Sequence, residues 1–188
     1  MTSAPSTGDV IDVLIADHRD VTALIGNIKS VKDPMIRRDL TDTAISELVR
    51  HAVAEEMYIY PAMKDHLPDG DKAVEHDVEE HKELEETMKR LEDVDVSSAE
   101  FEQALAKLEE VLADHVRDEE DEQFPELRRH VPAEKLVELA GKVETAKKLA
   151  PTRPHPGAPN AELFHKLVGP GVGLVDRLRD KLSGRATK

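Results

Sequence analysis

The chain contains no cysteine, and aromatic residues make up only 3% of its 188 residues. Without cysteine it has no disulfide, no iron–sulfur cluster, no thiolate zinc site and no thiol nucleophile. The scarcity of aromatics, beside ample Leu, Val, Ala and Ile, favours helix-on-helix packing over an all-β sandwich. No apolar run approaches the roughly 18 residues of a membrane span, and the opening MTSAPSTGDV lacks the basic and apolar regions of a signal peptide. We therefore expect a soluble, cytoplasmic, all-α protein.

Positive charge is also in short supply. The chain has 26 Lys and Arg against 40 Asp and Glu, which gives a formal net charge of −14. A chain of this sign repels nucleic acid phosphates and anionic membrane surfaces, so we predict neither as a partner. Carboxylates that converge inside a protein can instead bind cations.

Helical periodicity predicts four segments in the first two thirds of the chain. They cover residues 9–31, 34–60, 71–91 and 99–124, and Pro61 is expected to end or kink the second. We predict an up-down-up-down four-helix bundle over residues 9–132, after a disordered stretch at 1–8. Residues 133–188 are expected to form a helical extension with an amphipathic helix at 133–149, a Pro-rich turn at 151–160 and a last helical segment, VDRLRDKL, at 175–182. This extension either packs on the bundle or docks a protein partner or a second copy of the chain, and both interpretations remain open.

One sequence frame occurs twice in the chain. Residues 51–68 read HAVAEEMYIYPAMKDHLP and residues 115–132 read HVRDEEDEQFPELRRHVP. Both have His at position 1, Glu at 5 and 6, an aromatic residue and Pro at 10 and 11, His at 16 and Pro at 18. A preceding helix adds one more His to each copy, because the spacing from His18 to His51 is nearly the same as that from His81 to His115.

Six ionisable residues of this repeat fall on the apolar stripes of the four predicted helices, where leucines would be expected. They are His18, His51, Glu55, His81, His115 and Glu119. A single inward histidine is usually a hydrogen-bonded core residue, but buried carboxylates accompanied by imidazoles need a compensating cation. Two halves related by a pseudo-twofold axis predict one metal ion at His18, His51 and Glu55 and another at His81, His115 and Glu119, with either Glu able to bridge. Non-haem iron suits this donor set best, and manganese and zinc are alternatives.

Further residues are candidates of lower rank. Tyr58, three residues after Glu55, is expected on the metal face as a pocket residue, a hydrogen-bond partner or a ligand. Glu122 is its counterpart in the second frame, and Glu85 completes another His-x-x-x-Glu spacing. His76 lies about 140° around the helix from His81 and reaches the metal only if that helix begins irregularly.

The repeated frame resembles the hemerythrin-like HHE cation-binding family, over roughly residues 9–132, and the tail is similar to an extension of bacterial members. The resemblance implies a four-helix bundle with a dinuclear iron site and assigns its ligands to the six residues above. It also implies oxygen carriage or sensing, iron or redox sensing, or handling of nitric oxide or peroxide. The oxygen carriers have two His four residues apart on the third helix, which this chain lacks, so reversible carriage is less expected.

We therefore expect a di-iron protein that reacts with or senses oxygen, peroxide or nitric oxide. Catalase-like or nitric-oxide-handling activity is the enzymatic form of this hypothesis, and the sequence does not decide whether the protein is an enzyme. The alternatives are a regulatory module that reports iron or oxygen status to a partner, and an oxygen carrier or storage protein.

Overall fold

The computed structural model describes residues 8–155 together with residues 176, 180, 181, 184 and 185. The elements of residues 8–155 are helical: α1 (Val10–Ser30), α2 (Pro34–Ala54), η1 (Glu55–Ile59), α3 (Tyr60–His66), α4 (Gly70–Asp93), α5 (Ala99–Asp118), η2 (Glu119–Gln123), α6 (Phe124–His130) and α7 (Ala133–Leu149). The two elements named η are single π-helical turns. The all-α fold class is thus confirmed.

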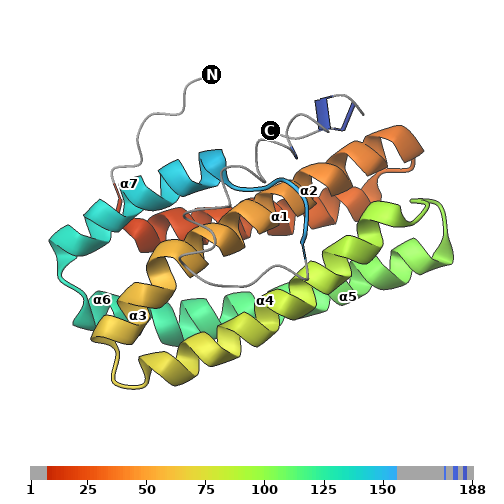
Figure 1. Cartoon of the computed structure of the whole chain (residues 1–188). Helices are drawn as coiled ribbons and strands as arrows, with labels where there is room; N and C mark the ends of the chain where they lie inside the picture. The colour runs from red at the N-terminus through yellow and green to blue at the C-terminus, as the bar shows by residue number, and fades with distance from the viewer. Residues whose placement is uncertain (1–7, 156–175, 177–179, 182–183, 186–188) are drawn as a thin grey trace.

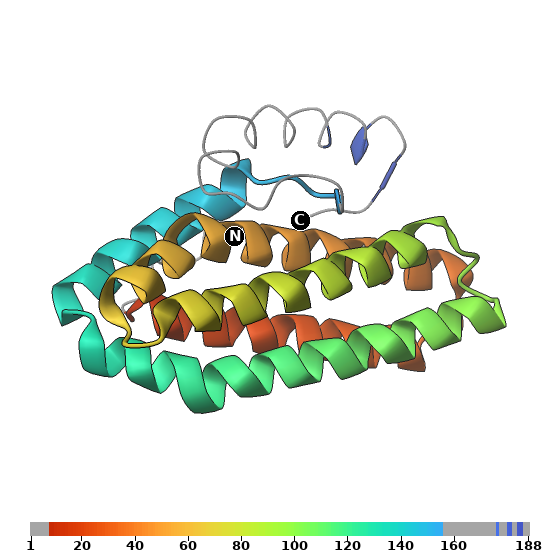
Figure 2. The same ribbon diagram turned by 60° about the horizontal axis from the view of Figure 1, so that its bottom comes forward.

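Four antiparallel rods form the bundle (Figures 1 and 2). The first is α1, the second is the run α2–η1–α3, the third is α4, and the fourth is the run α5–η2–α6. Helix α7 lies outside the bundle and packs on α1 and α2. The result is the up-down-up-down arrangement that the short connections predict.

Side-chain caps fix where three of the rods begin. The Asp9 carboxylate accepts a hydrogen bond from the Asp12 N–H, while the Asp12 side chain accepts one from the Asp9 N–H, which forms a capping box. Asp33 caps α2, whose first residue is Pro34, and the Ser98 hydroxyl caps α5. Residues close in the sequence therefore determine where these three rods begin, independently of how the rods pack.

The second and fourth rods continue through a proline. A proline inside an α-helix clashes with the carbonyl four residues earlier and donates no hydrogen bond. Both prolines follow a π turn, in which the N–H of Tyr60 bonds the Glu55 carbonyl and the N–H of Phe124 bonds the Glu119 carbonyl. The wider π turn contains one extra residue, so the side chains that follow it point in a different direction around the helix axis than in a regular α-helix. Pro61 consequently does not end the helix, and the segment continues to His66.

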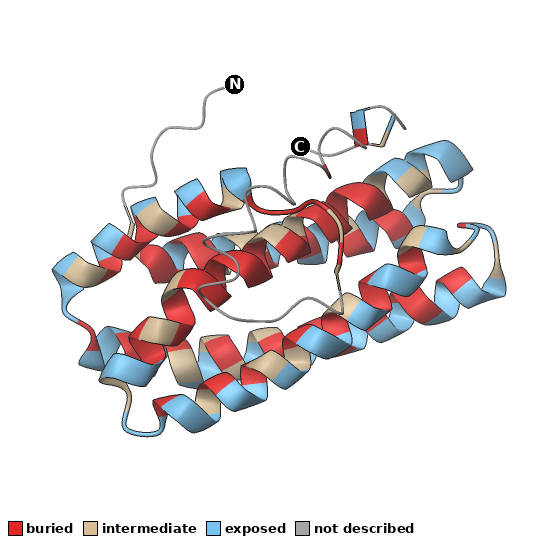
Figure 3. Ribbon diagram, in the orientation of Figure 1, coloured by how far each residue is buried: buried red, intermediate tan, exposed pale blue. Residues whose placement is uncertain are grey.

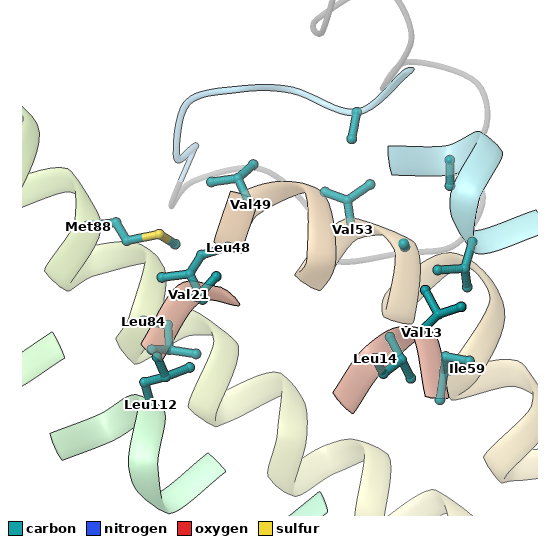
Figure 4. Close-up of a cluster of buried hydrophobic side chains, with 14 of the residues drawn as sticks. Val13, Leu14, Val21, Leu48, Val49, Val53, Ile59, Leu84, Met88 and Leu112 are labelled. Carbon is teal, nitrogen blue, oxygen red and sulfur yellow. The ribbon is translucent and has the colours of Figure 1, made fainter. Parts of the chain in front are cut away.

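The core is apolar along most of the bundle, and the exposed residues lie on its outer faces (Figure 3). One layer of this core is formed by Val21, Leu48, Leu84 and Leu112, which are at most 4% exposed and lie together in Figure 4. Each of the four is three residues from one of the predicted ligand histidines. This apolar layer therefore lies about one helical turn along the bundle axis from the histidines and covers them on that side.

Helix α7 has the bounds that the sequence predicts for the first part of the extension. After it, the Thr152 hydroxyl donates a hydrogen bond to Asp180, and Arg153 forms an ion pair with the same carboxylate. Most of the Pro-rich turn, most of the last predicted helix and the expected disorder at 1–7 lie outside the described residues. None of the helices described has the length and apolar character that a bilayer span requires.

Candidate metal centre

The six predicted ligand residues meet in the middle of the bundle and are 0–3% exposed. Helices α1, α2, α4 and α5 each contribute one histidine, and the two glutamates are the first residues of the two π turns. We call these residues the six-residue cluster: His18, His51, Glu55, His81, His115 and Glu119. Equivalent residues of the two sequence frames thus occupy equivalent positions in the two halves of the bundle.

Glu119 bridges the two halves of the cluster. Its Oε2 atom lies 3.2 Å from His18 Nε2 and 3.4 Å from His115 Nε2. Burial alone would lower the pKa of His18, but the Glu119 carboxylate next to its Nε2 atom outweighs that effect and raises the pKa to about 9. Burial acts against ionisation of Glu119 too, and the surrounding imidazoles, His115 first, still lower its pKa to about 2. The carboxylate is therefore held ionised.

Glu55 takes the equivalent place in the other copy of the frame. Its Oε2 atom lies 3.2 Å from His51 Nε2 and 3.4 Å from His81 Nε2. Burial again opposes the charged imidazole, yet the neighbouring carboxylates of Glu55 and Glu56 raise the pKa of His81 well above its usual value of 6.5. Each carboxylate thus contacts one histidine from each half, and the bridging of two metal ions by these glutamates stays a prediction.

The outer nitrogen of every cluster histidine contacts a carboxylate of a neighbouring rod. The Nδ1 pairs are His18–Glu120 at 2.8 Å, His51–Asp17 at 3.4 Å, His81–Glu56 at 3.3 Å and His115–Glu80 at 3.0 Å. Since an ionised carboxylate only accepts hydrogen bonds, Nδ1 carries the hydrogen, and the lone pair of a neutral imidazole lies on Nε2. This arrangement orients all four Nε2 atoms as metal donors.

Several buried polar atoms of the cluster have no hydrogen-bond partner among the described residues. They are both carboxylate oxygens of Glu55, Oε2 of Glu119 and Nε2 of His115. Ligand atoms of His18, His51, His115 and Glu119 lie within 4.8 Å of one another, and so do those of Glu55, His81 and His115. Buried acceptors of this kind are stable only with a compensating cation or proton. The donor set of imidazole nitrogen and carboxylate oxygen fits a metal such as iron.

The lower-ranked candidates lie away from this cluster. Tyr58 is half-buried and packs against the apolar core, Glu85 is half-buried, and Glu122 is exposed. His76 is 54% exposed and contacts Glu80 and Asp118 in a separate surface group. A regular 100° step per residue places Tyr58 and Glu122 on the interior face, but the π turn rotates both away from it.

The same rotation brings two aromatic residues to the cluster that the helical spacing missed. The Tyr60 hydroxyl lies 3.0 Å from His81 Nδ1, and the Phe124 ring stacks on His18 with centroids 5.8 Å apart and planes at 9°. Both residues are position 10 of the repeated frame, directly before its proline. That proline, inside a helix, was the signal from which the change of phase could have been predicted.

Comparison with known proteins agrees with this geometry. A model of the hemerythrin HHE cation-binding domain matches residues 9–127, and the chain belongs to this family. An uncharacterized hemerythrin-like protein of Schizosaccharomyces pombe is 32% identical over 174 residues, which cover 92% of this chain and 86% of that protein. A DNA nickase of Nostoc sp. is 27% identical over 139 residues, 74% of this chain and 39% of the nickase. No solved structure matches the chain.

Proposed function

We propose that the six-residue cluster binds two iron ions and that the protein reacts with, or senses, small oxidants such as peroxide, dioxygen or nitric oxide. One observation supports this most: four Nε2 donors face two buried carboxylates, whose oxygens Oε1 and Oε2 of Glu55 and Oε2 of Glu119 have no hydrogen bond among the described residues. Two buried carboxylates among four imidazoles need positive charge, which metal ions supply. Mixed nitrogen and oxygen ligation suits iron, with manganese and zinc as the alternatives.

Iron held by these residues would supply exchangeable coordination positions and redox equivalents for a small oxidant. The chain itself orients the imidazole ligands and excludes water from the centre. The outer carboxylates hold the imidazole rings in place, and the apolar layer of Val21, Leu48, Leu84 and Leu112 keeps water from one side. The enzymatic form of the proposal is peroxide disproportionation, in which two hydrogen peroxide molecules give two water molecules and one dioxygen, with no other reactant.

Iron-loaded protein and an oxygen electrode test this proposal. We expect added peroxide to be consumed with one dioxygen released for every two peroxide molecules. His115→Ala should abolish the reaction, whereas His130→Ala, which alters a histidine of the same frame outside the cluster, should leave it unchanged. Equal rates in wild type and His115→Ala would reject the cluster as the reactive site. Absence of reaction in the wild type with peroxide, dioxygen and nitric oxide would reject the oxidant proposal.

A second candidate function, a sensor that reports the state of the centre, is favoured by one contact path. Lys147 of α7 donates a hydrogen bond to Asp17 at 2.5 Å, and Asp17 contacts His51 Nδ1. The extension thus reaches a cluster histidine through one carboxylate. Metal loading is expected to slow hydrogen exchange in α7, and Lys147→Ala to remove that response. Identical exchange with and without metal would contradict the sensor.

We do not extend DNA nicking to this chain. The matched region covers 39% of the Nostoc protein, and a net charge of −14 repels phosphates. Our proposal remains that small molecules, and not nucleic acid, are the partners of the centre.

A further inference from the structure

The two halves of the bundle differ in one layer beside the six-residue cluster. The layer lies one turn beyond the cluster toward α3 and α6, on the side opposite to the apolar layer described above. The repeat relates Leu14 to Asp77, because each lies one helical turn before the histidine of its own helix, His18 or His81. It relates Ile59 to Gln123, because both take position 9 of the repeated frame. One half therefore has an aliphatic pair where the other has a polar pair.

The aliphatic pair belongs to the His18 half. Leu14 and Ile59 are 0% and 1% exposed and lie next to each other in Figure 4. The Phe124 ring, which stacks on His18, adds another apolar surface. In this layer, the aliphatic pair and the Phe124 ring offer a small molecule van der Waals contact only.

The polar pair belongs to the His81 half. Asp77 lies four residues before His81 on the uninterrupted helix α4, so both are on one face, one turn apart. Asp77 is 0% exposed, and the Gln123 amide donates a hydrogen bond to its Oδ1 at 2.6 Å. Burial raises the pKa of Asp77 to about 7. The Tyr60 hydroxyl, in contact with His81, adds a third polar group to this half.

This polar pair is not internally satisfied. Asp77 Oδ2 and Gln123 Oε1 are buried and have no hydrogen-bond partner among the described residues. Unpartnered buried oxygens reduce stability, and the Leu14–Ile59 pair demonstrates that the same level of the bundle can be filled with aliphatic side chains. A polar pair that packing does not need, with buried oxygens beside the six-residue cluster, is a sign of a binding role.

We propose that Asp77 and Gln123, together with the Tyr60 hydroxyl, bind the small oxidant at the His81 half of the centre and select one that forms hydrogen bonds, namely hydrogen peroxide. Peroxide both donates and accepts hydrogen bonds, so it satisfies the free oxygens of the pair. Dioxygen and nitric oxide have no hydrogen to donate and leave those oxygens unpartnered. The proposal rests on the proposed function and narrows it to one substrate class.

The test replaces the polar pair of the His81 half by the aliphatic pair found in the His18 half. The double variant Asp77→Leu/Gln123→Ile gives the His81 half the aliphatic pair of the His18 half. Leu14→Met/Ile59→Val is the matched control, because it repacks the same level of the other half without changing polarity. For each protein, iron content, nitric oxide affinity and the KM and kcat for peroxide are measured with iron bound, and urea unfolding is measured without iron.

For the double variant we expect unchanged iron content, nitric oxide affinity within about twofold, and a KM for peroxide raised about tenfold, the effect of one lost hydrogen bond. The iron-free variant should unfold at the same or a higher urea concentration than the wild type. Asp77→Asn, which keeps a hydrogen-bond donor and an acceptor, should retain the KM of the wild type for peroxide.

Two results would overturn the inference. An unchanged KM in the double variant would mean that the pair does not contact peroxide. A parallel loss of nitric oxide affinity, peroxide turnover and iron-free stability would assign the pair a structural role. Failure of the wild type to react with peroxide, dioxygen or nitric oxide would instead reject the proposed function itself, so the two failures are distinguishable.

Discussion

Raising the pH of the metal-free protein removes protons from histidines that the folded state holds more tightly than the unfolded chain does. The pKa of His18 is about 9 in the folded protein against 6.5 ordinarily, because Glu119 and Glu55 outweigh the effect of burial. A group whose pKa is raised by folding stabilises the fold fully below its unfolded pKa and loses that contribution as the pH rises through its folded pKa. The loss should therefore fall between about pH 6.5 and pH 9.

The magnitude follows from the same two values. Each pKa unit corresponds to about 1.4 kcal/mol, so His18 contributes on the order of 3 kcal/mol. Its side chain is 3% exposed, and solvent screens the contacts little. The lowered pKa of Glu119 describes the same contacts from the side of the carboxylate and is not added. A domain of ordinary stability has about 5–15 kcal/mol in total, so the change is large enough to measure.

Urea unfolding followed by circular dichroism, with a chelator present, measures the free energy of unfolding at pH 6.5, 7.5, 8.5 and 9.5. We expect the free energy of unfolding to fall by about 3 kcal/mol over the series, and His18→Gln to reduce the slope. Iron-loaded protein should behave in the opposite way. Metal-bound imidazoles carry no proton on the donor nitrogen, so stability is kept above about pH 6.5 and lost as the pH falls below it. A flat profile for the metal-free protein would refute the reasoning.

Two further predictions concern a second contact of His18 and the junction of α3 and α4. Glu120→Gln weakens the partner of His18 Nδ1 and should lower iron affinity about 10-fold to 100-fold in a chelator competition, whereas the exposed Glu122→Gln should not change it. Gly70→Ala should destabilise the protein by more than about 2 kcal/mol in urea unfolding, because its Cβ would lie 2.1 Å from a backbone carbonyl oxygen of α3. Gly26→Ala, in an exposed turn of α1 with nothing within 4 Å, should instead stabilise it by up to about 1 kcal/mol, and a loss there equal to that at Gly70 would contradict the packing argument.

The sequence predicts the bundle well because its signals are local. Apolar periodicity, the caps at Asp9 and Ser98 and the bounds of α7 all follow from neighbouring residues. The meeting of the six-residue cluster follows from the repeat, since two frames of equal spacing on parallel rods, the second and the fourth, place equivalent residues at one level. The family assignment agrees with both.

The wall of the centre is where prediction from a regular helix failed. Each π turn changes the phase of its rod, so that Tyr60 and Phe124 replace Tyr58 and Glu122 beside the cluster. Glu80, the partner of His115, was also missed, because it contacts a different rod and periodicity within one helix does not register such a contact. Residues that depend on the packing of several rods require the structure.

Metal analysis of untagged protein from iron-supplied cells tests the central claim most directly. We predict about two iron ions per chain, and a lower content in both His51→Ala and His115→Ala, because each variant removes one Nε2 donor from a different half of the cluster. Substoichiometric metal that neither substitution changes would mean that the six-residue cluster is a structural network, and the account of the centre would be wrong.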